Sequence, residues 1–269
     1  MLKLVTAWLD LHYLDDLARQ DSVVHRLHPA GKLVITLAFA VTATAFDQYE
    51  VAGLLPLFFY PVAVIALGNL PGRRLLQRLL LVSPVVLLIG LFNPLFDRTP
   101  HNVAGFFIIT GGWLSFISLT LKLALTTTAA LLLMATTTLP AIAAALRQLG
   151  LPRPLVVQLL LLHRYLFVLL EEVGRIVQAC ELRAAPGKGL PFRAWGSLLG
   201  QLLLRTVSRA ERIYQAMRCR GFDGEIRLLA TRPLQTIDYC HLLAWCGFFL
   251  LCRIVNLPNL LGHFLLEVL

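Results

Sequence analysis

Long uncharged stretches alternate along the chain with short polar segments. A helix needs about 20 apolar residues to cross the roughly 30 Å hydrocarbon core of a bilayer. Five stretches meet or approach this length and are predicted membrane spans: Leu33–Phe46, Val51–Leu70, Leu79–Phe96, Trp113–Thr138 and Ile237–Asn256. The first is short for a span, and Lys122 is the only charged residue deep within the longer ones. The pattern predicts an all-α membrane protein with about five or six transmembrane helices.

The residues just before the fourth span are apolar as well. Residues 103–138 form a hydrophobic stretch too long for one ordinary span, and the glycine pair in Thr110–Gly112 is its natural break. We predict a short outer or re-entrant piece at Val103–Ile109, followed by a full span at Trp113–Thr138.

The composition agrees with a membrane protein. Apolar residues make up 58% of the 269 residues, charged residues make up 14%, and the mean hydropathy is +0.74. Soluble domains are about half apolar and about a quarter charged. Residues 1–30 contain four aspartates and no long apolar run, which argues against a cleaved signal peptide. The five cysteines include no C-x-x-C pair, so neither a disulfide framework nor a zinc site is predicted.

Nearly the whole net positive charge lies in one segment. Residues 139–236 hold 14 lysines and arginines against six acidic residues, and the whole chain has a net charge of +9. Basic segments beside membrane spans stay in the cytoplasm. We therefore predict four parts: a cytoplasmic N-terminal segment at 1–32, transmembrane helices at 33–138, a cytoplasmic domain at 139–236, and a last transmembrane helix with a tail at 237–269.

The basic segment is itself apolar at helical spacing. A first helix is predicted over LPAIAAALRQLGLPRP, with stop signals at Gly150 and Pro152. One long helix or two shorter ones follow between Leu155 and Gly189. A further helix is predicted between Ala194 and Gly224, with its apolar residues near one stripe. The cytoplasmic domain is therefore expected to consist of long amphipathic helices.

Both long helices end in a basic tip rich in small residues, Glu181–Gly187 and Met217–Gly224. Three interpretations are open. Gly221 suits the left-handed position after a helix end, where neighbouring arginines also interact favourably with the helix dipole. A basic amphipathic helix could instead lie on anionic lipid. In the third interpretation, small residues let the backbone approach a partner protein while a guanidinium binds its carboxylate.

The stretch RAERIYQAMRCRGFDG, from Arg209 to Gly224, resembles the signature of the transmembrane T component of energy-coupling factor transporters, especially the cobalt-type branch. That family carries two short Ala-Arg-Gly-like motifs in a cytoplasmic coupling domain. The second motif, with cysteine in place of the usual alanine, is matched here by Ala216, Met217, Cys219, Arg220 and Gly221. The first motif, with alanine in place of glycine, is matched by Leu182, Arg183 and Ala184.

Four further stretches carry the likeness along most of the chain. They are HRLHPAGKLVITLAF from His25, GLFNPLF from Gly90, TTTLPAIAAALRQLGLPRPLV from Thr136 and HRYLFVLLEEVGRI from His163. The resemblance implies a membrane helix bundle with long, crossed coupling helices that lie roughly parallel to the membrane.

The resemblance also implies a non-catalytic subunit that works in a complex in the cell membrane. In the family, two ATP-binding ABC ATPase subunits bind the coupling helices, and the motif arginines dock in grooves on those subunits. A separate membrane subunit binds the substrate and responds to the ATP-driven movement. For this chain we therefore expect the bilayer and these subunits as partners, no cofactor and no nucleic acid.

The sequence motifs argue against a membrane enzyme and against a transporter that hydrolyses ATP itself. The sequence has no H-E-x-x-H, no G-x-S-x-G and no pair of intramembrane carboxylates, which argues against a membrane enzyme. It has no G-x-x-x-x-G-K-[ST], so energy for transport must come from another chain.

A direct metal-binding permease is a more serious alternative, because imidazoles bind cobalt and nickel well. No shared spacing defines a site among the candidate histidines, which are His12, His25, His28, His101, His241 and His263. The resemblance favours Co²⁺ as the substrate, with Ni²⁺ and vitamins as alternatives. The role of Lys122 is left open at this stage.

Overall fold

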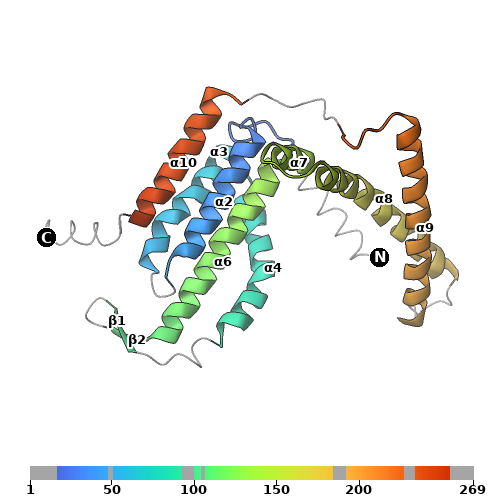
Figure 1. The fold of residues 1–269 in the computed structure, drawn as a ribbon. Coiled ribbons are helices and arrows are strands. Elements are labelled where there is room, and N and C mark those ends of the chain that lie inside the picture. The colour runs from blue at the N-terminus through green and yellow to red at the C-terminus, as the bar shows by residue number, and fades with distance from the viewer. Residues whose placement is uncertain are drawn as a thin grey trace. The chain divides into compact units, whose positions relative to one another are not determined.

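The computed structural model describes residues 17–47, 51–92, 100–103, 107–183, 192–226 and 234–254. Their contacts divide them into two compact units, one with residues 17–138 and 234–254 and the other with residues 139–226. Nearly all of the described chain is helical (Figure 1). The predicted all-α membrane architecture is therefore confirmed, with one two-stranded hairpin as an exception.

The first unit is a bundle around helix α2. Its described helices are α2 (Pro29–Ala45), the 3₁₀-helix η1 (Ala52–Phe58), α3 (Phe59–Gly68), α4 (Gly72–Gly90), α6 (Gly111–Thr136) and α10 (Thr236–Ile254). Helix α2 packs between α6 and α10, and α4 packs against α6 (Figure 1). The core is apolar: Phe39, Leu125 and Phe249 are each at most 1% exposed. These helices converge on one core because each contributes an apolar face to it.

Three of the described helical segments are long and apolar enough to cross a membrane: α6, α10 and residues Arg153–Cys180 of α8 (Arg153–Arg183). Helix α2 and the η1–α3 segment are shorter apolar helices. Helices α6 and α10 coincide closely with the spans predicted at Trp113–Thr138 and Ile237–Asn256. The α8 segment lies in the part predicted to be cytoplasmic, although its length and composition by themselves would permit a span.

The run predicted as one span at Val51–Leu70 consists of two pieces, the 3₁₀-helix η1 and the α-helix α3. Pro56 lies inside η1 and Pro61 lies in the first turn of α3. A proline has no backbone N–H to donate and disfavours helical backbone at the residue before it. The hydrophobic pattern correctly predicted an apolar run at Val51–Leu70. The two prolines explain why this run forms a 3₁₀-helix followed by an α-helix.

The piece predicted at Val103–Ile109 overlaps an antiparallel hairpin. Strand β1 (Pro100–Val103) pairs with β2 (Phe107–Thr110), with Pro100 opposite Thr110 and Val103 opposite Phe107. Helix α6 begins directly after β2 at Gly111, which confirms the break predicted at Thr110–Gly112. A re-entrant helix would not place these residues in strands, so the structure favours a short hairpin.

Lys32 on α2 and Lys122 on α6 bind backbone carbonyls at the C-terminal ends of each other's helices. From α2, the Lys32 Nζ donates to the carbonyl of Thr136 at the end of α6, at 2.9 Å. From α6, the Lys122 Nζ donates to the carbonyls of Phe46 and Asp47, just past the end of α2. The last carbonyls of a helix have no partner within the helix and carry partial negative charge, so an ammonium group satisfies them well. The role of Lys122 is therefore to tie α6 to α2.

Three of the candidate metal-binding histidines have polar partners within the first unit. His25 Nε2 donates to the carbonyls of Leu17 and Ala135, at 3.0 and 3.3 Å. The Nδ1 of His28 accepts from the backbone N–H of Ala30 and thereby caps α2. His241 Nε2 accepts from the indole N–H of Trp245 at 3.0 Å. Within the described residues, no group of three side chains suited to a metal ion occurs.

The stability of the first unit is expected to depend on pH through His25. Burial lowers the pKa of His25 below its ordinary value of 6.5. The unfolded chain therefore binds more protons than the folded chain once the pH falls below 6.5, and the free energy of unfolding decreases. Thermal unfolding in detergent should show a lower midpoint as the pH falls from about 7 to about 5. The decrease should be smaller in His25→Gln, and an equal decrease in both proteins would contradict this explanation.

Candidate coupling surface

The described helices of the second unit are α7 (Leu139–Gln148), α8 (Arg153–Arg183) and α9 (Phe192–Cys219). Helix α7 ends as the sequence predicts. Gly150 has φ +98°, and the N–H of Leu151 donates to the carbonyl of Leu146 at 3.0 Å. This pattern is a Schellman motif, in which a glycine in the left-handed conformation closes the helix. Pro152 follows, and α8 begins at the next residue.

Helices α8 and α9 run in opposite directions. Arg153 at the start of α8 pairs with Glu225 just beyond α9, with 3.6 Å between Nε and Oε2. Glu172, farther along α8, pairs with Arg205 in the middle of α9. The C-terminal tips of the two helices therefore lie at opposite ends of the pair. Helix α8 has 31 residues, which corresponds to about 46 Å.

The second predicted motif forms the C-terminal tip of α9. Gly221 has φ +79°, its N–H donates to the carbonyl of Arg218, and the N–H of Phe222 donates to the carbonyl of Met217, each at 3.0 Å. Gly221 thus occupies the left-handed position of a Schellman motif, as predicted. The exposed motif residues are Ala216, Cys219, Arg220 and Gly221, whereas Met217 is half-buried.

Arg220 is exposed just beyond the end of α9. No hydrogen bond or ion pair joins its side chain to another residue in the part of the chain that the structure describes. A Cβ built on Gly221 would meet no heavy atom of the described residues within 4 Å. Among these residues, none fills the space beside Gly221.

The first predicted motif lies at the end of α8. Leu182 is 81% exposed, and Arg183 is exposed in the last turn of the helix. An arginine at this place is favourable beside the negative end of the helix dipole. Ala184, the third residue of this motif, lies outside the described residues. Both tips thus present an exposed arginine at a helix C-terminus.

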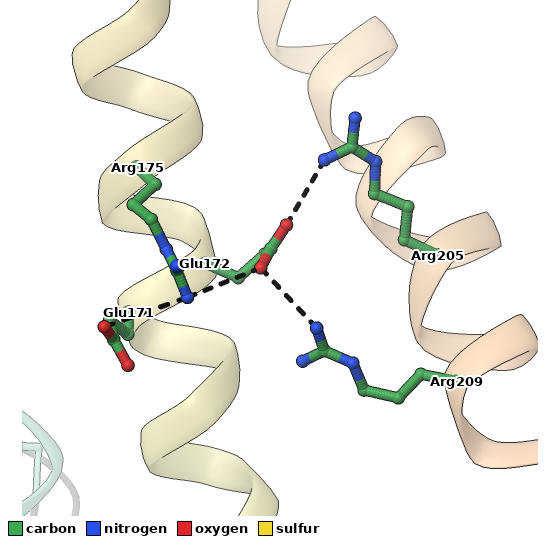
Figure 2. A network of polar contacts seen from close by, with 5 residues as sticks. All are labelled: Glu171, Glu172, Arg175, Arg205 and Arg209. Atoms are coloured by element: carbon green, nitrogen blue, oxygen red, sulfur yellow. Dashed lines mark hydrogen bonds and ion pairs between the residues drawn. The ribbon is translucent and has the colours of Figure 1, made fainter. Parts of the chain in front are cut away.

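A cluster of five charged residues joins the middle of α8 to α9 (Figure 2). The Glu172 Oε1 lies 3.2 Å from Nη1 of Arg205, and Oε2 lies 3.7 Å from Nη2 of Arg209. From its own helix, the Nη2 of Arg175 lies 3.7 Å from Oε2 of Glu172 and 3.8 Å from Oε1 of Glu171. The side chain of Glu172 is 19% exposed, against 68% for Glu171. Glu172 is the centre of this cluster.

An apolar groove of about 550 Å³ lies between the two helices. One wall comes from α8 and includes Leu161 and Tyr165, and the other comes from α9 and includes Ile213 and Met217. Leu169 and Arg209 line the groove as well, and Arg209 belongs to the Glu172 cluster. Beyond this cluster, the two helices therefore leave open space between them.

A second carboxylate closes the other end of the groove. Glu225 Oε1 lies 3.5 Å from Nε of Arg147, and Oε2 lies 3.6 Å from Nε of Arg153. The groove is also lined by Phe222 and Gly224, which directly precede this contact. Glu225 thus holds the segment that follows the α9 tip against the α7–α8 corner.

The structure adds two residues to the site that the sequence analysis did not single out. Glu172 lies between the two tips, and Glu225 lies just beyond the α9 tip. One signal for Glu172 was present, since a carboxylate among leucines on a helix face needs a partner when it is half-buried. Its partners Arg205 and Arg209 lie on another helix, so the sequence could not identify them.

The fold and the tips define a helical membrane protein whose second unit presents two basic helix ends. The family described as cobalt transport protein, CbiQ, matches residues 20–229. The chain therefore belongs to this family, the cobalt-type transmembrane T components of energy-coupling factor transporters.

Individual relatives agree with the family. The chain is 27% identical over 218 residues to the energy-coupling factor transporter transmembrane protein EcfT of Bacillus subtilis (strain 168), covering 76% of this chain and 82% of the relative. It is 33% identical over 100 residues to the cobalt transport protein CbiQ of Rhodobacter capsulatus, covering 36% and 41%. It is 32% identical over 99 residues to the nickel permease LarQ of Lactiplantibacillus plantarum, covering 37% and 36%.

Proposed function

We propose that this T component transmits ATP-driven movement of two ABC ATPase subunits to a separate substrate-binding membrane subunit of an importer. The position of two arginines supports the proposal. Arg183 and Arg220 are both exposed, and each ends one helix of an antiparallel pair at opposite ends of that pair. Two separated basic tips suit two separate ATPase subunits, since each guanidinium can bind a carboxylate on its own partner. ATP hydrolysis would then take place on the other chains.

We propose Co²⁺ as the transported substrate. The family description and the relative named as a cobalt transport protein support this choice. Ni²⁺ is the second candidate, because a relative of nearly equal identity is named as a nickel permease. A vitamin is the third candidate, because T components in the wider family serve vitamin-binding subunits.

The test is to co-express the chain with candidate ATPase and substrate-binding subunits from its own genome and to purify the complex. The complex in liposomes should take up Co²⁺ only when ATP is supplied, and parallel assays with Ni²⁺ and with vitamins identify the substrate. The chain by itself should neither bind Co²⁺ stoichiometrically nor transport it. Transport by the chain by itself would instead support the direct metal-binding permease.

We further propose that the second unit faces the cytoplasm, and Cys219 provides a test. This native cysteine is exposed within the α9 tip. In a variant that keeps Cys219 and replaces the other four cysteines, a membrane-impermeant maleimide should label inside-out vesicles and leave intact cells unlabelled. Labelling in intact cells would place the unit on the outer side and contradict the proposed orientation.

A further inference from the structure

We propose that Glu172 is the pivot of the α8–α9 pair, the contact about which the two helices turn when their tips are displaced. This inference rests on the proposed function, in which the ATPase subunits move the tips. It assigns a positioning role to a residue that lies in neither motif.

The charges around Glu172 make it the fixed point between the helices. Its half-buried carboxylate faces two guanidiniums of α9, Arg205 and Arg209, and one of its own helix, Arg175. Contacts of a carboxylate with arginines are directional and stronger than neutral hydrogen bonds. Along the groove next to the cluster, most of the facing side chains are leucines and other apolar groups, whose contacts have no preferred direction. Along this stretch of the two helices, sliding is therefore resisted at Glu172 and not by the apolar walls of the groove.

The cluster also tolerates rotation. Arg205 and Arg209 are one helical turn apart on α9, and each binds a different oxygen of Glu172. When the crossing angle changes, one of these contacts can lengthen while the other is kept. Glu172 therefore stays paired with α9 while the helices turn, which suits a moving joint.

The motifs lie on either side of this contact. Arg183 lies 11 positions after Glu172 on α8, and Arg220 lies 11 positions after Arg209 and 15 after Arg205 on α9. The arms are therefore about 16 Å long on α8 and about 16–22 Å long on α9, and they extend in opposite directions. When either tip is displaced, its helix turns about the contact, and the groove between the helices changes its width.

The experiment compares Glu172→Gln with Glu171→Gln. Glu171 is the neighbouring carboxylate, and it pairs with Arg175 of its own helix. Among the described residues it makes no ion pair with α9, so the control removes the same charge and leaves the contact between the helices intact. Spin labels are attached at Gln178→Cys on α8 and Gln215→Cys on α9, both exposed positions, in the otherwise cysteine-free full chain in nanodiscs. The distance distribution between the labels should broaden in Glu172→Gln and stay unchanged in Glu171→Gln.

The second measurement uses the full complex in liposomes. Glu172→Gln should retain the ATPase subunits but lose substrate uptake per ATP hydrolysed by roughly 5-fold or more, the lower range of typical coupling factors. Glu172→Asp, which keeps a carboxylate, should recover part of this loss. The double variant Arg205→Lys/Arg209→Lys keeps the net charge but replaces both guanidinium groups with ammonium groups, which bind a carboxylate less directionally. It should therefore behave like Glu172→Gln.

An unchanged distance distribution in Glu172→Gln would overturn the pivot. A broadened distribution with unchanged uptake would overturn its role in coupling. If the wild-type chain fails to bind the ATPase subunits, the proposed function is wrong, and the distance measurement on the chain by itself still decides whether Glu172 fixes the helix crossing.

Discussion

Arg220→Glu should abolish co-purification of the ATPase subunits with this protein, and with it ATP-dependent uptake. The Schellman motif at Gly221 holds Arg220 at the exposed end of α9, where its guanidinium has no partner among the described residues. Removing one member of a buried arginine–carboxylate pair costs about 3–5 kcal/mol, and the new carboxylate adds repulsion. Binding should therefore weaken more than about a hundredfold. The measurement is pull-down of the tagged chain followed by quantification of bound ATPase.

The matched control is Arg212→Glu, which makes the same charge change at an exposed position on the same helix, two turns before the tip. It should retain the ATPases. Arg183→Glu at the other tip should weaken binding or uptake less, because the first motif departs from the family pattern at Ala184. Full assembly and full uptake in both Arg220→Glu and Arg183→Glu would contradict the docking role of the tips.

Gly221→Val should also disrupt the α9 tip, although it changes no charge. Gly221 has φ +79°, a conformation that costs a residue with a side chain about 1–2 kcal/mol and suits a β-branched residue least. The strain is in the backbone, since no heavy atom lies within 4 Å of the position of the added Cβ. The last turn of α9 should therefore open and displace Arg220, and ATPase pull-down should fall markedly.

Gly221→Asn provides the comparison, because asparagine adopts the left-handed conformation more readily than valine. The asparagine variant should keep most of the ATPase binding, and both variants should unfold at similar temperatures, since the tip is exposed. Equal binding by Gly221→Val and wild type would show that the shape of the helix end has no part in docking.

Much of the helical architecture could be predicted, because helix formation and helix ends depend on neighbouring residues. The span predicted at Trp113–Thr138 became α6, and the stops expected at Gly150 and Gly221 are both left-handed glycines that close a helix. Apolar runs and glycine positions are local properties of the chain. The division of Val51–Leu70 into two helices was missed, although Pro56 and Pro61 were visible in the sequence.

The motif arginines were identified in the sequence because the stretches around them resemble the two motifs of the family, and the local pattern predicted that each lies at a helix end. The structure then shows that both are exposed and that their helices are antiparallel. Whether they contact ATPase subunits stays a prediction. The groove between the helices was outside the reach of sequence reasoning, because its walls come from segments that meet only after folding.

By itself, the sequence determined where most of the helices lie, that the chain is a membrane protein, and where two basic tips end their helices, whereas the helix α4 begins seven residues before the span predicted at Leu79–Phe96. The tertiary structure decided which charged groups meet. Glu172 pairs with Arg205 across 33 residues, and Lys32 reaches the carbonyl of Thr136 across 104 residues. Helix periodicity and capping are settled within a few residues of the chain, whereas a half-buried charge needs a partner that only the packing of distant segments can bring to it.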